Sequence, residues 1–190
     1  SKTLYAIFKQ KTQPQPGEDG VYYIKNYEKG TYFTSTSSKS SLSSTKQEFK
    51  FKSLNNSGLY RVYFTTGGTT YSLDYERLEF APSSSLATST SESDNLFFYE
   101  IADINARTLS ATKVNSVQAG KYYFILGTSK SSGNTYIMSN TPYNSSSLGA
   151  VKIADAKRPE TISISKTEGT PCIYTLESKN PEYVTVHVGS

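Results

Sequence analysis

The sequence predicts an all-β protein with a closed antiparallel repeat architecture. Short runs rich in Tyr, Phe, Val, Ile and Thr alternate with clusters of Gly, Ser and Asn, and no helical periodicity interrupts them. One kind of run also recurs, as GVYYIKN at 20–26, TTYSLDY at 69–75, GKYYFIL at 120–126 and PCIYTLE at 171–177. These copies are spaced by 49, 51 and 51 residues, and a period in this range is typical of repeat architectures.

The composition favours one domain, which we expect to cover residues 1–190. Only 35% of the residues are apolar, but the chain contains 16 Tyr and 9 Phe. Because each of these rings can bury a large apolar area, we expect a core of aromatic and β-branched side chains.

Four types of strand follow one another in each repeat. The first type is expected at 4–9, 59–65, 108–114 and 161–166, and the second type is the recurring run described above. The third is expected at 31–36, 78–82, 135–140 and 183–188, and the fourth at 48–53, 96–101 and 150–153. The resulting units of about 50 residues cover 3–56, 57–105 and 106–157, with a partial unit at 158–190.

Two details of the units carry expectations about packing and loops. Strand alternation places Tyr22 and Ile24 on one face and Tyr23 on the other, and in the same way separates Tyr122 and Phe124 from Tyr123. We assign these tyrosines to packing.

Ser/Thr-rich stretches at 35–46, 83–93 and 144–149 join the third strand to the fourth, which predicts equivalent loops.

Closed architectures of two kinds suit units of this size. A β-trefoil has three four-strand units, whereas a propeller with four blades would need four. Three full units and one partial unit match neither count cleanly, and we expect a β-trefoil-like fold, with a four-bladed propeller or a β-sandwich as alternatives.

The stretch QEFKFKSLNNSGLYRVYFTTGGTTYSLDY, at 47–75, resembles the ricin B-type lectins. The repeats of that family carry a Gln-x-Trp motif, a G-x-Y-x-I strand and a strand that ends near Leu-Asp. GVYYIKNYEKGTYF at 20–33 is similar to the same family, although Phe49 stands where the family has Trp and the chain contains no Trp. The resemblance implies a β-trefoil that contacts sugars through variable loops.

The spread of charge and the small number of Cys and His residues argue against several classes of function. The net charge of +4 is spread thinly along the chain, so no nucleic-acid partner is expected, and no stretch has the length needed for membrane insertion. Cys172 and His187 are the sole residues of their kinds, so no intrachain disulfide and no multi-histidine metal site can form. We expect no enzyme activity, no cofactor and no metal, and the polar, sulfur-poor composition favours a secreted or cell-surface protein.

Candidate binding residues recur after the second or third strand of the units. They are Asn26 with Tyr27, Asp74 with Tyr75, and Asn140 with Tyr143. Flat rings beside amide or carboxylate oxygens suit sugar recognition, so we expect a noncatalytic carbohydrate-binding, lectin-like module with glycans as partners. The alternatives are a module that binds a partner protein, such as a β-trefoil protease inhibitor or an adhesin, and an assembly role through edge strands.

Overall fold

The computed structural model describes residues 20–55, 57–76, 79–83, 85–145, 147–154, 158–166 and 172–179, and it confirms the all-β class. These residues form fourteen strands and a single 3₁₀ turn, with no α-helix among them. The strands are β1 (Gly20–Asn26), β2 (Tyr32–Ser35), β3 (Ser40–Ser43), β4 (Phe49–Leu54), β5 (Leu59–Thr66), β6 (Thr69–Glu76), β7 (Glu79–Pro82), β8 (Phe97–Ile101), β9 (Thr108–Lys113), β10 (Tyr122–Thr128), β11 (Thr135–Asn144), β12 (Ser147–Ala154), β13 (Thr161–Ser165) and β14 (Tyr174–Ser178), and the turn is η1 (Glu92–Asp94).

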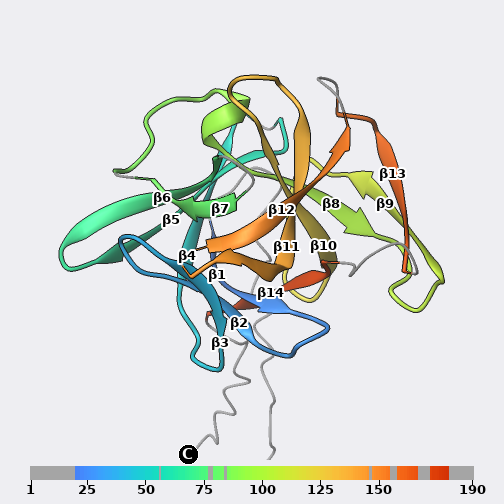
Figure 1. The fold of residues 1–190 in the computed structure, drawn as a ribbon, viewed down its shortest axis with the longest axis horizontal. Coiled ribbons are helices and arrows are strands. Elements are labelled where there is room, and N and C mark those ends of the chain that lie inside the picture. Colours follow the sequence, from blue (N-terminus) through green and yellow to red (C-terminus); the bar gives the residue numbers. More distant parts are fainter. Residues whose placement is uncertain are drawn as a thin grey trace, which may run out of the picture.

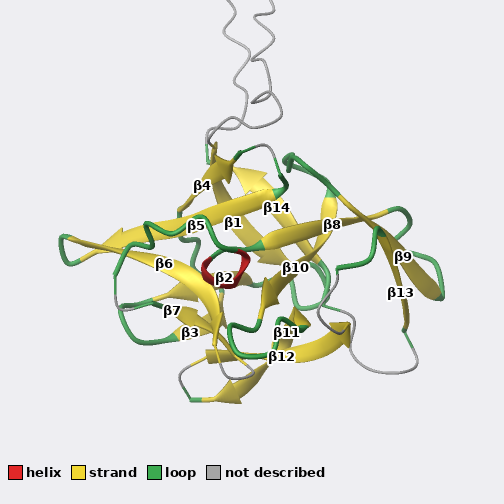
Figure 2. Cartoon of the chain, turned by 90° about the horizontal axis from the view of Figure 1, so that it is seen from above, coloured by secondary structure: helices red, strands yellow, loops and turns green. Residues whose placement is uncertain are grey.

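Antiparallel pairing closes nine of these strands into a barrel. The ring runs β1–β14–β10–β11–β12–β7–β6–β5–β4 and returns to β1. The remaining strands extend from it, with β8, β9 and β13 at the right of Figure 1 and the β2–β3 hairpin below the barrel. The turn η1 contacts β6 and β10, and Figure 2 shows it in red near the middle of the view from above.

Most expected strands form close to the positions read from the sequence, and β1 has the expected bounds. Two of the Ser/Thr-rich stretches that we expected to be loops differ: β3 forms inside 35–46, and β11 and β12 extend into 144–149 and leave only a short turn between them. Serines fit β3 because the Ser40 hydroxyl is buried against the Ser35 hydroxyl at 3.2 Å, while Gln47 pairs with the Ser35 backbone. The strands expected at 4–9 and 183–188, as well as His187, lie outside the described residues.

The strand pairing does not confirm the repeat. Strands β4, β8 and β12 were expected to be equivalent fourth strands. However, β4 pairs with the second-type strand before it, β8 pairs with the second-type strand after it, and β12 pairs with β11 and β7. The recurrence in the sequence therefore marks where strands form, because it reflects local alternation and turns, but it does not fix their partners.

Aromatic side chains dominate the core, as the composition predicted. The largest fully buried side chains, apart from Leu109, are all rings: Tyr60, Tyr99, Tyr123, Tyr174, Phe33, Phe49, Phe51, Phe80, Phe97, Phe98 and Phe124. Buried tyrosines need partners for their hydroxyls. Tyr60 accepts a hydrogen bond from the Val117 backbone at 3.1 Å, and Tyr174 donates one to the Ser139 carbonyl at 3.0 Å.

Alternation holds in β1 but not in β10. Tyr22 and Ile24 are buried while Tyr23 is partly exposed, as expected. In β10, by contrast, every residue from 123 to 128 is buried, so both faces of the strand are covered. Tyr123 was expected on the face opposite Phe124 and was assigned to packing, and it is 1% exposed and packs on Phe98 with ring centroids 5.9 Å apart. A period-two pattern shows which residues share a face, but it cannot show how many faces a strand buries.

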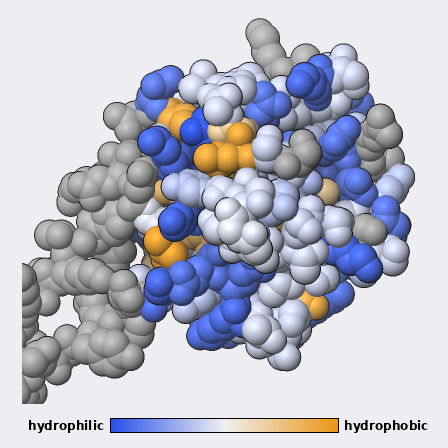
Figure 3. Space-filling view, turned by 90° about the vertical axis from the view of Figure 1, so that its left-hand side faces the viewer, coloured by the Kyte–Doolittle hydropathy of each residue, from blue (hydrophilic) through white to orange (hydrophobic). Residues whose placement is uncertain are grey.

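The surface is largely polar. Figure 3 shows a mostly hydrophilic face with small, separate hydrophobic spots. Among the described residues, the exposed large apolar side chains are Tyr27, Leu86, Tyr143 and Val151. None of the helical structure in this part of the chain has the length and apolar character required to cross a membrane.

Candidate functional site

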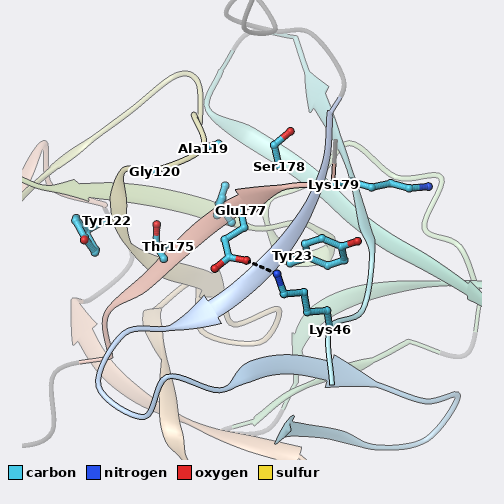
Figure 4. A pocket seen from close by; sticks show the side chains of 10 residues that line it. Tyr23, Lys46, Ala119, Gly120, Tyr122, Thr175, Glu177, Ser178 and Lys179 are labelled. Carbon is cyan, nitrogen blue, oxygen red and sulfur yellow. Dashed lines mark hydrogen bonds and ion pairs between the residues drawn. The ribbon is translucent and has the colours of Figure 1, made fainter. Parts of the chain in front are cut away.

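A groove of about 700 Å³ lies against three neighbouring strands, β1, β14 and β10. Figure 4 shows its lining, which consists of Tyr23, Lys46, Ala119, Gly120, Tyr122, Thr175, Leu176, Glu177, Ser178 and Lys179. The floor is β14, which is paired on one side with β1 and on the other with β10. The groove therefore joins four segments that are separate in the sequence, near residues 23, 46, 120 and 177.

Alternation along β14 decides which of its side chains line the groove. Tyr174 and Leu176 turn inward and are 0% and 1% exposed, so Thr175 and Glu177 face outward. The register places Glu177 opposite Tyr23, and it places Thr175 between Lys25 of β1 and Tyr122 of β10. A strip of polar groups thus runs along the floor, with a tyrosine on each side.

Glu177 is the centre of a charged network. Its two carboxylate oxygens each lie 3.0 Å from the Tyr32 hydroxyl, which donates to them, and Lys46 donates to Oε2 at 3.0 Å. Lys25 lies 3.5 Å from Oε1. Partial burial alone would raise the pKa of Glu177, but the hydrogen bonds from Lys46 and Tyr32 and the two lysine charges lower it below its ordinary value. Glu177 is therefore ionised at neutral pH and held in one orientation.

Paired tyrosines flank the polar strip. On one side, Tyr23 meets Tyr32 edge-on with ring centroids 6.4 Å apart, and the Lys46 ammonium lies 5.2 Å from each ring centroid. On the other side, Tyr122 meets Tyr27 edge-on at 5.4 Å. Such contacts fix ring orientations, because edge-to-face pairs and cation–π contacts are each favourable. The two pairs are preformed aromatic surfaces.

The β1–β2 turn positions Tyr27 beside Tyr122. Asn26 Oδ1 accepts the Lys29 backbone N–H at 2.9 Å, and the Gly30 N–H bonds to the Asn26 carbonyl at 2.9 Å. Gly30 has φ +65°, a left-handed conformation that glycine adopts without strain. The Tyr27 N–H also bonds to the Ile173 carbonyl at 2.8 Å, which ties the turn to the start of β14.

Three of the six residues proposed from the sequence gather at this turn. Asn26 is 0% exposed and shapes the turn, Tyr27 is 43% exposed beside the groove, and Asn140 is joined to the turn by a 2.8 Å hydrogen bond from Lys29 Nζ to its carbonyl. Tyr143 is exposed near the end of β11, outside the lining of the groove.

Asp74 and Tyr75, on β6, are also absent from the lining of the groove. Tyr75 is 7% exposed and stacks on Tyr136 with ring centroids 4.3 Å apart. Asp74 is partly buried and interacts electrostatically with Glu76, Asp94 and Lys130. The three places proposed from the sequence therefore do not form three equivalent sites.

The principal lining residues of the groove were not among those predicted from the sequence. Tyr23 and Tyr122 belong to the recurring runs, but we had assigned the tyrosines of those runs to packing. Thr175 and Glu177 are ordinary outward residues until β14 inserts between β1 and β10. No signal in the sequence could have joined these strands, because their pairing is set by the tertiary fold.

The Cys172 thiol and the acidic residues give little support for a nucleophilic or metal-binding site. Cys172 is 4% exposed, and burial raises the pKa of its thiol to about 11, so the nucleophilic thiolate is scarce at neutral pH. Within the described ranges, no three His, Cys, Asp or Glu side chains are grouped so that they could hold a metal ion.

No protein-family model and no curated protein matches this chain. The function must therefore be argued from the groove.

Proposed function

We propose that this protein is a noncatalytic carbohydrate-binding module, secreted or at the cell surface, and that its binding site is the groove over β1, β14 and β10. One observation carries the proposal: two preformed tyrosine pairs flank a strip of hydroxyl and charged groups in a groove of about 700 Å³. Sites for small molecules commonly have volumes of about 300 to 1,000 Å³ and combine apolar walls with a few fixed polar groups.

Each part of the groove has a counterpart in a sugar. The flat faces of Tyr23 and Tyr122 suit the C–H groups of a pyranose ring. The Thr175 hydroxyl and the Glu177 carboxylate offer hydrogen bonds to sugar hydroxyls. Because Glu177 is already held by Tyr32 and Lys46, little side-chain entropy is lost when a ligand binds.

The β-trefoil arrangement and the expected relationship to the ricin B-type lectins remain predictions, and the proposal does not depend on them. The groove uses strand faces, whereas the resemblance implies contacts through variable loops.

A glycan array followed by titration tests the proposal. The protein should bind one glycan class at micromolar concentration, with or without calcium, and a blank array in both buffers would contradict the proposal. Tyr122→Ala should weaken binding about tenfold, as expected when an aromatic anchor is removed from a site. The control is Tyr143→Ala, which removes an exposed tyrosine outside the groove and should leave affinity unchanged. Circular dichroism should show that both variants keep the fold.

A further inference from the structure

A second cavity, of about 440 Å³, is lined in part by the β1–β2 turn. Lys29 and Thr31 come from this turn and its end, Ser41 and Leu42 from β3, Asn140 from β11 and Leu148 from β12. The cavity is separate from the groove, because the two linings share no residue.

Lys29 gives this cavity an uncompensated positive charge. Its Nζ donates to the Asn140 carbonyl at 2.8 Å, which is a neutral acceptor, and it forms no ion pair among the described residues. No carboxylate is among the described residues that line the cavity. Of the nearby acids, Glu28 accepts the Ile173 N–H at 3.0 Å, and Glu79 accepts hydrogen bonds from Ser147 and from Asn144, which belongs to the cavity lining. In the groove, by contrast, Lys25 and Lys46 both pair with Glu177.

Two further polar groups at the cavity have no partner in the part of the chain that the structure describes. They are the Asn140 side-chain nitrogen and the Thr31 hydroxyl, both buried, and Asn140 is 1% exposed. A buried donor without an acceptor is costly, and such groups are rare in folded proteins. Because these two atoms have almost no accessible surface, an acceptor oxygen of a ligand reaches them only if the Asn140 and Thr31 side chains turn toward the cavity.

The remaining lining is mixed. Leu42 and Pro142 supply accessible apolar surface and Ser41 adds a hydroxyl, whereas Leu148 is 1% exposed. A free inorganic anion would use the donors but leave the apolar part unfilled, whereas a neutral sugar would leave the Lys29 charge without a counterion. A sugar ring that carries a carboxylate matches both parts.

We propose that this cavity binds a carboxylate-bearing sugar, with its carboxylate at Lys29 and its ring over Leu42 and Pro142. This site is independent of the groove, so either proposal can fail without the other.

Titration calorimetry with D-glucuronate tests the site, with D-glucose and inorganic phosphate as comparison ligands. Glucuronate should bind saturably in the millimolar range, and glucose should bind more weakly by about tenfold, the value of one charge-assisted contact. Lys29→Met should weaken glucuronate binding by about the same factor, and Lys29→Arg should retain most of it. The matched control is Lys113→Met, because Lys113 lies on β9 and pairs with Glu160 at 3.0 Å.

Four results would overturn the inference. These are the absence of saturable glucuronate binding, equal affinity for glucose, unchanged affinity in Lys29→Met, and phosphate binding as tight as glucuronate binding, which would indicate a simple anion site. The groove variant Tyr122→Ala separates the two proposals. It should leave glucuronate affinity unchanged, and a parallel loss would place the ligand in the groove and contradict the second site.

Discussion

Asp74 should make the stability of this protein depend on pH. It lies on β6 near η1, where burial raises the pKa of its carboxyl to about 7, with Glu76 and Asp94 adding repulsion and Lys130 opposing them. The unfolded chain ionises this group near its ordinary pKa of 3.8. Between these two pKa values the folded state binds more protons than the unfolded state, so the free energy of unfolding falls as the pH rises.

The protonated Asp74 carboxyl contributes to the free energy of unfolding. This contribution is fully present below the unfolded pKa of 3.8 and is lost as the pH rises through the folded pKa of about 7. A difference of about 3 pKa units corresponds to about 4 kcal/mol as an upper limit. Because Asp74 is partly exposed, solvent screens its charge, and we expect the free energy of unfolding to change by about 2 kcal/mol.

The Asp74→Asn variant isolates this effect, because the amide has the same shape and stays neutral. Urea unfolding at several pH values from 4 to 9 should give equal stability at the acidic end and a variant that is more stable by about 2 kcal/mol at pH 8. Asp103→Asn, in an exposed turn after β8, is the control. This variant should lose as much free energy of unfolding between low and high pH as the unmodified protein does. If Asp74→Asn loses stability with pH as steeply as the unmodified protein, the electrostatic reasoning is wrong.

Two further predictions concern packing around β10. Gly127→Ala should destabilise the protein by about 3 kcal/mol, because a Cβ there would collide with Tyr75 in a closely packed core. Gly67→Ala, in an open turn with φ +56°, should cost about 1 kcal/mol, and equal thermal shifts for the two variants would contradict this. Thr128 and Thr135 face each other across β10 and β11 with buried hydroxyls that lack partners in the described chain, so replacing both by Val should stabilise the protein by about 1 kcal/mol. A loss of stability on denaturant unfolding would instead mean that the hydroxyls hold a buried water.

Local patterns in the sequence were enough to predict the strands and the composition of the core. β1 has the expected bounds, and its alternation correctly separates Tyr22 and Ile24, which are buried, from Tyr23, which is partly exposed. The reason is physical: the period-two pattern and the glycine and asparagine turns act over a few residues. The turn at Asn26 was likewise visible, although its side chain serves the turn itself and is buried.

Long-range pairing was beyond such patterns. β14 lies between β1 and β10, and this placement alone brings Glu177 next to Tyr23 and Thr175 next to Tyr122. The recurring runs suggested equivalent units, yet equivalent sequences took different partners. The groove is therefore a product of topology, and residues chosen for their local composition, such as Asp74, lie outside its lining.

Mapping a bound glycan by NMR tests the central claim most directly. The glycan selected on the array would be titrated into isotope-labelled protein while the backbone amide shifts are followed. The account predicts that the largest shift changes fall in 119–123 and 175–179, on the two strands that frame the groove with β1. Changes concentrated around Asp74 and Tyr75 would contradict the account and would place the site where the sequence alone had suggested it.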